Sequence, residues 1–257
     1  METVAMSQAD FQAANPYASF GQIAAAAPAA ERLAFIKRTY IHLALAVYAL
    51  VTLEFIYFNV FAEQMKQWMP QLLGSFWILV MFGGFMITGW IAERWARSEV
   101  SVSKQYMGLG LYVFAESIFL APLLWIANHY ATDIGGFQFN PILVAGVLTF
   151  LVFAGLTAGV FLTRADFSYL GPILGIGGML AMGVIVASFF FNGLTAGLLF
   201  PIAIVVLASG YILYDTSNVL HHYRTTQHVA ASLALFASVA LLFWYILRIV
   251  IALSGRD

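Results

Sequence analysis

A single carboxylate, Asp215, stands within an apolar segment of helical length, and its surroundings make it the first candidate for chemistry. Tyr211 lies four residues before it, and Asn218 and His222 lie three and seven residues after it, so these four polar side chains should share one face of that helix. A charge in hydrocarbon costs about 2.5–3.5 kcal/mol on insertion scales. A membrane helix that retains such a charge usually uses it, and we expect this face to point into a helical bundle.

The position of Asp215 along its helix predicts a basic partner. If the helix ends near Leu220, helical rise places the carboxylate about 7 Å below the surface, within reach of Arg94 or Arg97. Burial disfavours a charged carboxylate, whereas a neighbouring guanidinium favours it, so a proton could make or break the contact. The pattern indicates a pH-sensitive latch. The alternative is a buried, hydrogen-bonded carboxylate that only fixes helix packing.

Three further ionisable residues fall within apolar segments. Glu54 lies near one end of its segment, where it can reach interfacial water, and Arg248 can extend its long side chain to the lipid headgroups. Glu116 lies near the middle of its segment, and structural and functional interpretations both remain open. We take Glu116, Glu54, Tyr211 and Asn218 as candidates for lining an ion pathway.

The composition places the elements that carry these residues in a lipid bilayer. The chain of 257 residues is 62% hydrophobic and 9% charged, whereas soluble domains carry about 25% charged residues. A net charge of −1 provides no basic surface for nucleic acid, so we expect no nucleic-acid partner. The chain has no cysteine, which excludes disulfides, thiolate nucleophiles and cysteine-based zinc sites, while histidine metal sites remain open.

Apolar segments of about 20 residues, the length that crosses a bilayer, recur along the chain. We therefore predict an all-α membrane protein, a bundle of seven transmembrane helices spanning residues 31–257. Residues 1–30 lack the basic and apolar regions of a signal peptide and are expected to be a disordered cytoplasmic tail. The predicted spans are Tyr40–Phe61, Leu72–Ala92, Tyr106–Ala127, Pro141–Leu162, Tyr169–Phe191, Pro201–Leu220 and Val229–Leu253.

Basic residues predict the orientation of these spans, because cytoplasmic loops carry an excess of Lys and Arg. With the N-terminus inside, the outer loops carry only Lys66, so we predict a cytoplasmic N-terminus and an external C-terminus. The last segment could instead re-enter on the same side, although its length favours a full crossing. The basic residues on the inner side would be Arg32, Lys37, Arg38, Arg94, Arg97, Lys104, Arg164 and Arg224.

No constellation of residues indicates catalysis, and we predict that the protein is not an enzyme and needs no cofactor. The last span has no lysine that could carry a retinal Schiff base. His42, at the start of the first span, and His221, His222 and His228, in the last inner turn, are candidate bases or ligands. Histidines in a cytoplasmic turn are more often solvated, although His221 and His222 could influence Asp215.

Several motifs together resemble the Bax inhibitor-1 family, also called the transmembrane Bax-inhibitor-motif family. They are Ile-Leu-Tyr-Asp at 212–215, the polar turn after it, and Leu-Phe-x-x-x-Leu-Arg at 242–248. The segments at 115–124 and 35–40 are similar to the third helix of bacterial members and to the approach to their first helix. The resemblance covers nearly everything after the first 30 residues.

The resemblance implies six helices around a central seventh and a pH-sensitive calcium leak. In members with the full pattern, two aspartates on the last two helices share a proton and contact an arginine at the end of the second helix. Asp215 matches the first aspartate and Arg94 is the nearest match to the arginine. The second aspartate is replaced by Ser238, which can donate a hydrogen bond but cannot share a proton at a carboxylate pKa.

Two functions follow as expectations. The first is a leak channel for calcium, gated by protons at Asp215, Ser238 and Arg94, with only weak and transient calcium contact at Asp215 because calcium prefers six to eight oxygen ligands. The second is a regulator that binds a membrane-anchored ATP-dependent protease, since a bacterial branch with serine at position 238 is associated with that role. For either function we expect a multi-pass protein of the bacterial plasma membrane.

Overall fold

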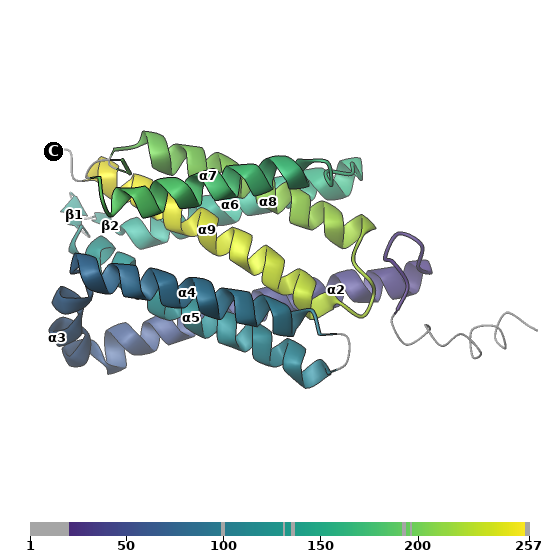
Figure 1. The fold of residues 1–257 in the computed structure, drawn as a ribbon, viewed down its shortest axis with the longest axis horizontal. Coiled ribbons are helices and arrows are strands. Elements are labelled where there is room, and N and C mark those ends of the chain that lie inside the picture. Colours follow the sequence, from purple (N-terminus) through teal and green to yellow (C-terminus); the bar gives the residue numbers. More distant parts are fainter. Residues whose placement is uncertain are drawn as a thin grey trace, which may run out of the picture.

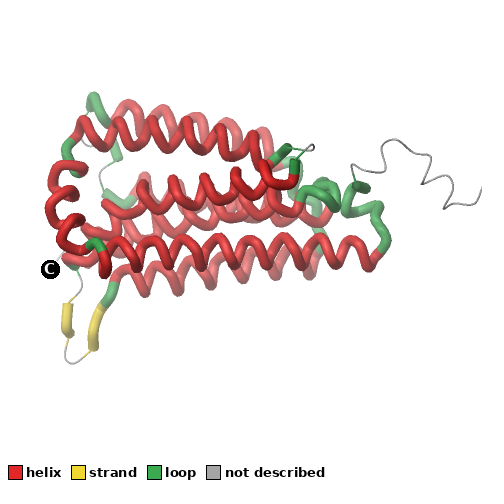
Figure 2. Tube along the Cα trace, turned by 90° about the horizontal axis from the view of Figure 1, so that it is seen from below, coloured by secondary structure: helices red, strands yellow, loops and turns green. Residues whose placement is uncertain are grey.

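The computed structural model describes residues 21–98, 101–130, 132–134, 137–191, 194–195 and 197–254. Long helices lie side by side and a short hairpin projects at one end (Figures 1 and 2). The elements are α2 (Ala29–Phe55), η2 (Ile56–Val60), α3 (Ala62–Leu72), α4 (Ser75–Ala96), α5 (Val102–His129), β1 (Thr132–Ile134), β2 (Phe137–Phe139), α6 (Pro141–Thr163), α7 (Leu170–Ser188), α8 (Leu199–His221) and α9 (His228–Ser254).

Seven helices in the described residues are long and apolar enough to cross a membrane, and each overlaps one of the seven predicted spans, although the first begins at Ala29 rather than Tyr40. The helix α9 has 27 residues, or about 40 Å by helical rise, which exceeds the roughly 30 Å of hydrocarbon. The last segment is therefore a continuous helix of full crossing length. We call the end of the bundle where α2 begins the N-side, and the end where α9 finishes the C-side (Figure 1).

The last helix is the centre of the bundle, as predicted. It contacts α2, α4, α5, α6 and α8. Half of its most apolar 18-residue stretch is buried inside the protein. The helix α7 instead packs mainly on α8, with Gly177 and Gly178 against the side chains of Leu207 and Tyr211. Only 6% of the most apolar 18-residue stretch of α7 is buried inside the protein, so most of this helix is exposed on the surface of the bundle. The core therefore forms around α9.

Two elements on the C-side were not predicted. The helix α3 is amphipathic rather than uniformly apolar, and buries Met65 and Met69, which are four residues apart. With 11 residues it is too short to cross the bilayer. The strands β1 and β2 pair in antiparallel register, with Thr132 opposite Phe139, and form the hairpin that projects from the bundle in Figure 2. Three-residue strands carry too little periodicity to be recognised from sequence.

Residues 1–20 of the expected tail lie outside the described residues. From Gly21 to Pro28 the chain lies against the loop between α8 and α9. The backbone N–H of Ala24 donates to the carbonyl of Tyr223 at 2.8 Å, and that of Thr225 donates to the carbonyl of Gln22 at 2.9 Å. These bonds connect the start of α2 with the turn that leads into the central helix.

Candidate functional site

Asp215 lies inside the bundle, with 8% of its surface exposed, where α8 packs against α9. The hydroxyl of Ser238 on α9 donates a hydrogen bond to its Oδ2 at 2.6 Å. That length is typical of a hydroxyl bound to a charged carboxylate. The serine that replaces the second aspartate of the resembling family therefore contacts Asp215 directly. In the described residues this is the one hydrogen bond that the carboxylate makes.

The basic group that acts on Asp215 is Arg97, at the N-side end of α4. Its guanidinium forms an ion pair with Glu93 at 3.0 Å and interacts with Asp215 through electrostatic attraction rather than direct contact. Arg94, the arginine expected from the resemblance, lies with its guanidinium 5.4 Å from the centre of the Trp90 ring. Arg97 directly follows the last residue of α4, three residues after Arg94. The charge that acts on the carboxylate is therefore that of Arg97, and not that of Arg94.

A cavity of about 470 Å³ surrounds this site on the N-side. Its lining includes Asp215, Ser238 and Tyr211 from α8 and α9, together with Glu93 and Arg97 from α4. The hydroxyl of Tyr211 donates to the carbonyl of Leu174 on α7 at 2.8 Å. The cavity thus collects two acids, one arginine and four hydroxyl groups, the other two hydroxyls being those of Tyr112 and Tyr214. Asn218, expected on the same face, does not line it; its carbonyl instead accepts the backbone N–H groups that end α8.

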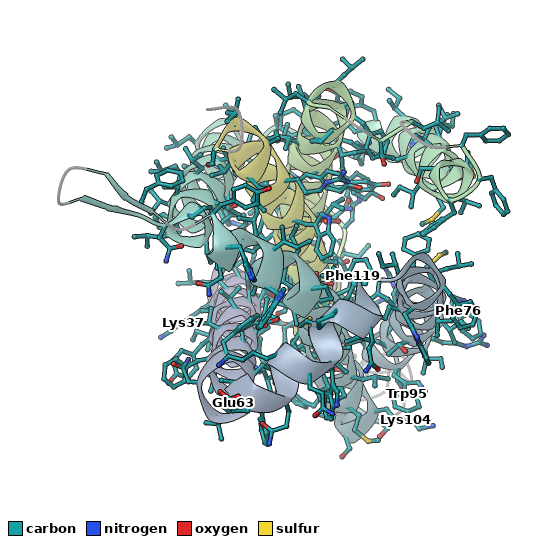
Figure 3. All side chains as sticks on the ribbon, turned by 90° about the vertical axis from the view of Figure 1, so that its left-hand side faces the viewer. Lys37, Glu63, Phe76, Trp95, Lys104 and Phe119 are labelled. Carbon is teal, nitrogen blue, oxygen red and sulfur yellow. The ribbon has the colours of Figure 1, made fainter. Side chains whose placement is uncertain are left out.

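A second cavity, of about 550 Å³, lies toward the C-side. Phe119 forms part of its wall and stacks between Phe85 and Trp244, with ring centres 4.7 and 4.6 Å away. The view from the C-side in Figure 3 shows Phe119 inside the outline of the bundle. Glu116 and Arg248 are the charged residues of this cavity. The two cavities share four lining residues: Phe85, Met86, Tyr112 and Ala237.

Glu54 and Glu116 form a pair of buried carboxyl groups on the contacting helices α2 and α5. They are 7% and 5% exposed, and the charges of the two groups interact. Neither oxygen of Glu54 has a hydrogen-bond partner in the described residues. Glu54 was expected to reach interfacial water, but the structure buries its side chain inside the bundle. Glu54 lines neither of the two cavities, whereas Glu116 faces the C-side cavity.

The loops on the N-side carry charge around the site. A hydrogen bond from the backbone N–H of Ser168 lowers the pKa of Asp166 to about 2, with smaller contributions from the Ser168 hydroxyl and from His222. Asp166 pairs with His222 at 3.2 Å. Burial, with the nearby charge of Asp215, raises the pKa of Tyr223 to about 12. Tyr223 therefore stays neutral at physiological pH, and Asp166 stays charged.

Substituting Ser238 with alanine should weaken the packing of α8 on α9. The variant leaves the Asp215 carboxylate without a donor, and hydrogen bonds to charged groups contribute about 1.5–3 kcal/mol. We expect a lower melting temperature in detergent, measured by circular dichroism. Ser209→Ala is the control, because within the described residues the Ser209 hydroxyl bonds only to the carbonyl of Val205 on its own helix. Equal melting temperatures for the two variants would show that the Ser238 bond contributes nothing.

Sequence reasoning missed Glu93 and Tyr223 as neighbours of the site. Glu93 had a detectable signal, since it lies four residues before Arg97 on a predicted helix, the usual spacing of an ion pair. Tyr223 had none, because its burial depends on how the loop after α8 folds back over residues from before α2.

Comparisons with known proteins give one consistent result. A family model described as "Inhibitor of apoptosis-promoting Bax1" matches residues 32–256. Bax inhibitor 1 of Schizosaccharomyces pombe is 28% identical over 232 residues, covering 88% of this chain and 79% of that protein. An uncharacterized protein of Neisseria meningitidis is 25% identical, covering 78% and 81%. The modulator of FtsH protease YccA of Escherichia coli is 32% identical over 109 residues, covering 42% and 49%.

Proposed function

Because the chain belongs to the Bax inhibitor-1 family, we propose that this multi-pass membrane protein is a cation leak channel that protons control at Asp215, with calcium as a conducted ion. The N-side would face the cytoplasm of a bacterial plasma membrane. The observation that carries the proposal is a buried carboxylate, held by Ser238 and attracted by Arg97, at the wall of a cavity.

The charge on Asp215 gives the gate its direction. While the carboxylate is charged, it attracts Arg97 and holds the end of α4 toward α8 and α9. A proton on Asp215 removes that attraction, whereas Arg97 keeps its ion pair with Glu93 on α4 itself. The end of α4 is then free to move away from α9. Conduction should therefore rise as pH falls.

The two cavities supply the path for the ion. The N-side cavity offers Asp215 and Glu93, and the C-side cavity offers Glu116. Between them stand Phe85, Met86, Tyr112 and Ala237, which are common to both linings. Phe85 and Met86 belong to α4, so a movement of this helix would open the partition between the cavities. Two or three carboxylates match weak, transient calcium contact rather than a tight site.

Calcium entry into sealed vesicles that hold the purified protein tests this function. We expect entry that increases with acidity in the natural protein, and entry that no longer depends on pH in Asp215→Asn, which cannot exchange the proton. Asp166→Asn is the control, because Asp166 is an exposed N-side carboxylate outside the spans. An absence of calcium entry at every pH would rule out the channel.

A second candidate is regulation of a membrane-anchored ATP-dependent protease. The observation in its favour is the similarity to the E. coli protein named as a modulator of FtsH protease. Residues 22 and 24 bond to the loop before α9 on the N-side, and we assign the contact with a protease to the residues that precede them. Co-purification of the protease with the full chain, and its loss when residues 1–20 are deleted, would favour this function. Vesicle flux that survives the deletion separates it from the channel.

A further inference from the structure

Three side chains with metal-binding atoms converge at the N-side, away from the Asp215 cavity. His42 on α2, Tyr106 on α5 and His228 at the start of α9 come from three helices far apart in sequence. The hydroxyl of Tyr106 lies 3.0 Å from Nε2 of His42 and 3.4 Å from Nε2 of His228. The two imidazole rings are 5.0 Å apart, centre to centre. The Nε2 atoms of both histidines thus face the Tyr106 hydroxyl.

The second nitrogen of His42 fixes the form of its ring. Nδ1 lies 2.7 Å from the backbone carbonyl of Arg38, and a carbonyl only accepts hydrogen bonds, so the proton of the neutral ring is on Nδ1. Nε2 then presents its lone pair. Metal-binding histidines commonly have this arrangement, in which one nitrogen donates to a carbonyl and the other binds the metal. In His228, Nδ1 is buried and has no partner in the described residues.

We propose that His42, Tyr106 and His228 form a binding site for a divalent transition-metal ion such as zinc. Imidazole nitrogen suits zinc, nickel and copper, whereas calcium and magnesium prefer sets of oxygen ligands. Two imidazoles and one hydroxyl supply three ligands, and water completes the four that zinc takes. The charge of Arg38 acts on His228 and repels a cation, so the affinity should be below that of a four-ligand structural site.

A metal at this position would connect α2, α5 and α9 at the end of the bundle. Because the unfolded chain does not bring these side chains together, binding should stabilise the folded state. Zinc should bind more weakly in acid, since protonated imidazole cannot act as a ligand. The site lies outside the Asp215 cavity and does not depend on the proposed channel function.

Zinc titration of the full chain, purified with a tag that lacks histidine, tests the site. We expect one zinc ion per chain and a higher melting temperature with zinc than without it, measured at neutral pH in detergent. His42→Ala and His228→Ala should each weaken zinc binding by roughly tenfold or more and remove the thermal effect. Calcium and magnesium should not displace the zinc.

Two controls distinguish this site from other histidines. His129 bonds to its own helix at the C-side, and His222 pairs with Asp166 in the N-side loops. His129→Ala and His222→Ala should bind zinc as the natural protein does. Unchanged zinc binding in His42→Ala, or its loss in His222→Ala alone, would overturn the proposal. Unaltered helical content in each variant, measured without zinc, shows that a loss of binding is not a loss of fold.

Discussion

Replacing Gly108 with alanine is expected to separate α4 from α5 and to destabilise the protein strongly. A Cβ atom at position 108 would lie 2.5 Å from the carbonyl oxygen of Ala92 and 2.7 Å from the backbone nitrogen of Ala96. Both neighbours are backbone atoms of α4, so no side chain can rotate away. Overpacking of a well-packed site costs about 1–3 kcal/mol and occasionally more. Thermal unfolding in detergent, followed by circular dichroism, measures the loss.

Gly110→Ala provides a matched control two residues further along α5. A Cβ atom there meets nothing within 4 Å, and alanine has the better helix propensity. This variant should be as stable as the natural protein, or slightly more stable. If both glycine variants lose stability equally, the close approach of α4 and α5 at Gly108 is incorrect. Gly108→Ala should also displace Glu93 and Arg97, which lie on the affected turns of α4, from the Asp215 cavity.

Replacing Glu54 with methionine is expected to stabilise the protein, which is the opposite of the usual effect of a buried substitution. Both carboxyl oxygens of Glu54 are buried without a partner in the described residues, and Glu116 adds an unfavourable interaction. An unsatisfied buried polar group costs about 1–3 kcal/mol, and methionine has a similar length without that cost. A higher melting temperature at neutral pH would confirm the prediction.

The same substitution at Glu63 is the control for Glu54. Glu63 lies on α3 with its side chain 81% exposed and pairs with Lys66 on the surface. Exposed ion pairs contribute little, so Glu63→Met should leave the melting temperature almost unchanged. A marked loss of stability in Glu54→Met would instead show that the carboxyl group has a stabilising role, such as holding a proton shared with Glu116.

The amino-acid pattern was sufficient for the spans and for Asp215. Runs of apolar residues at membrane length leave few alternatives to transmembrane helices, because backbone polar groups in lipid must be satisfied within the segment. A single acidic residue within such a run is conspicuous, because placing its charge in hydrocarbon costs free energy. The pairing of Asp215 with Ser238 was implied by the resemblance to the Bax inhibitor-1 family, and the structure places the two side chains in contact.

Helix rotation and loop contacts decided the rest. Arg94 and Arg97 are both near the end of α4, and the rotation of this helix in the bundle decides that Arg97, and not Arg94, lines the Asp215 cavity. Glu54 was expected near water, but its burial depends on which face of α2 meets α5. Tyr106 contacts two histidines that are distant along the chain: His42 is 64 residues away and His228 is 122 residues away. Sequence alone determined which residues are costly in a membrane, because that cost is local; tertiary structure decided their partners, because those come from helices that are distant along the chain.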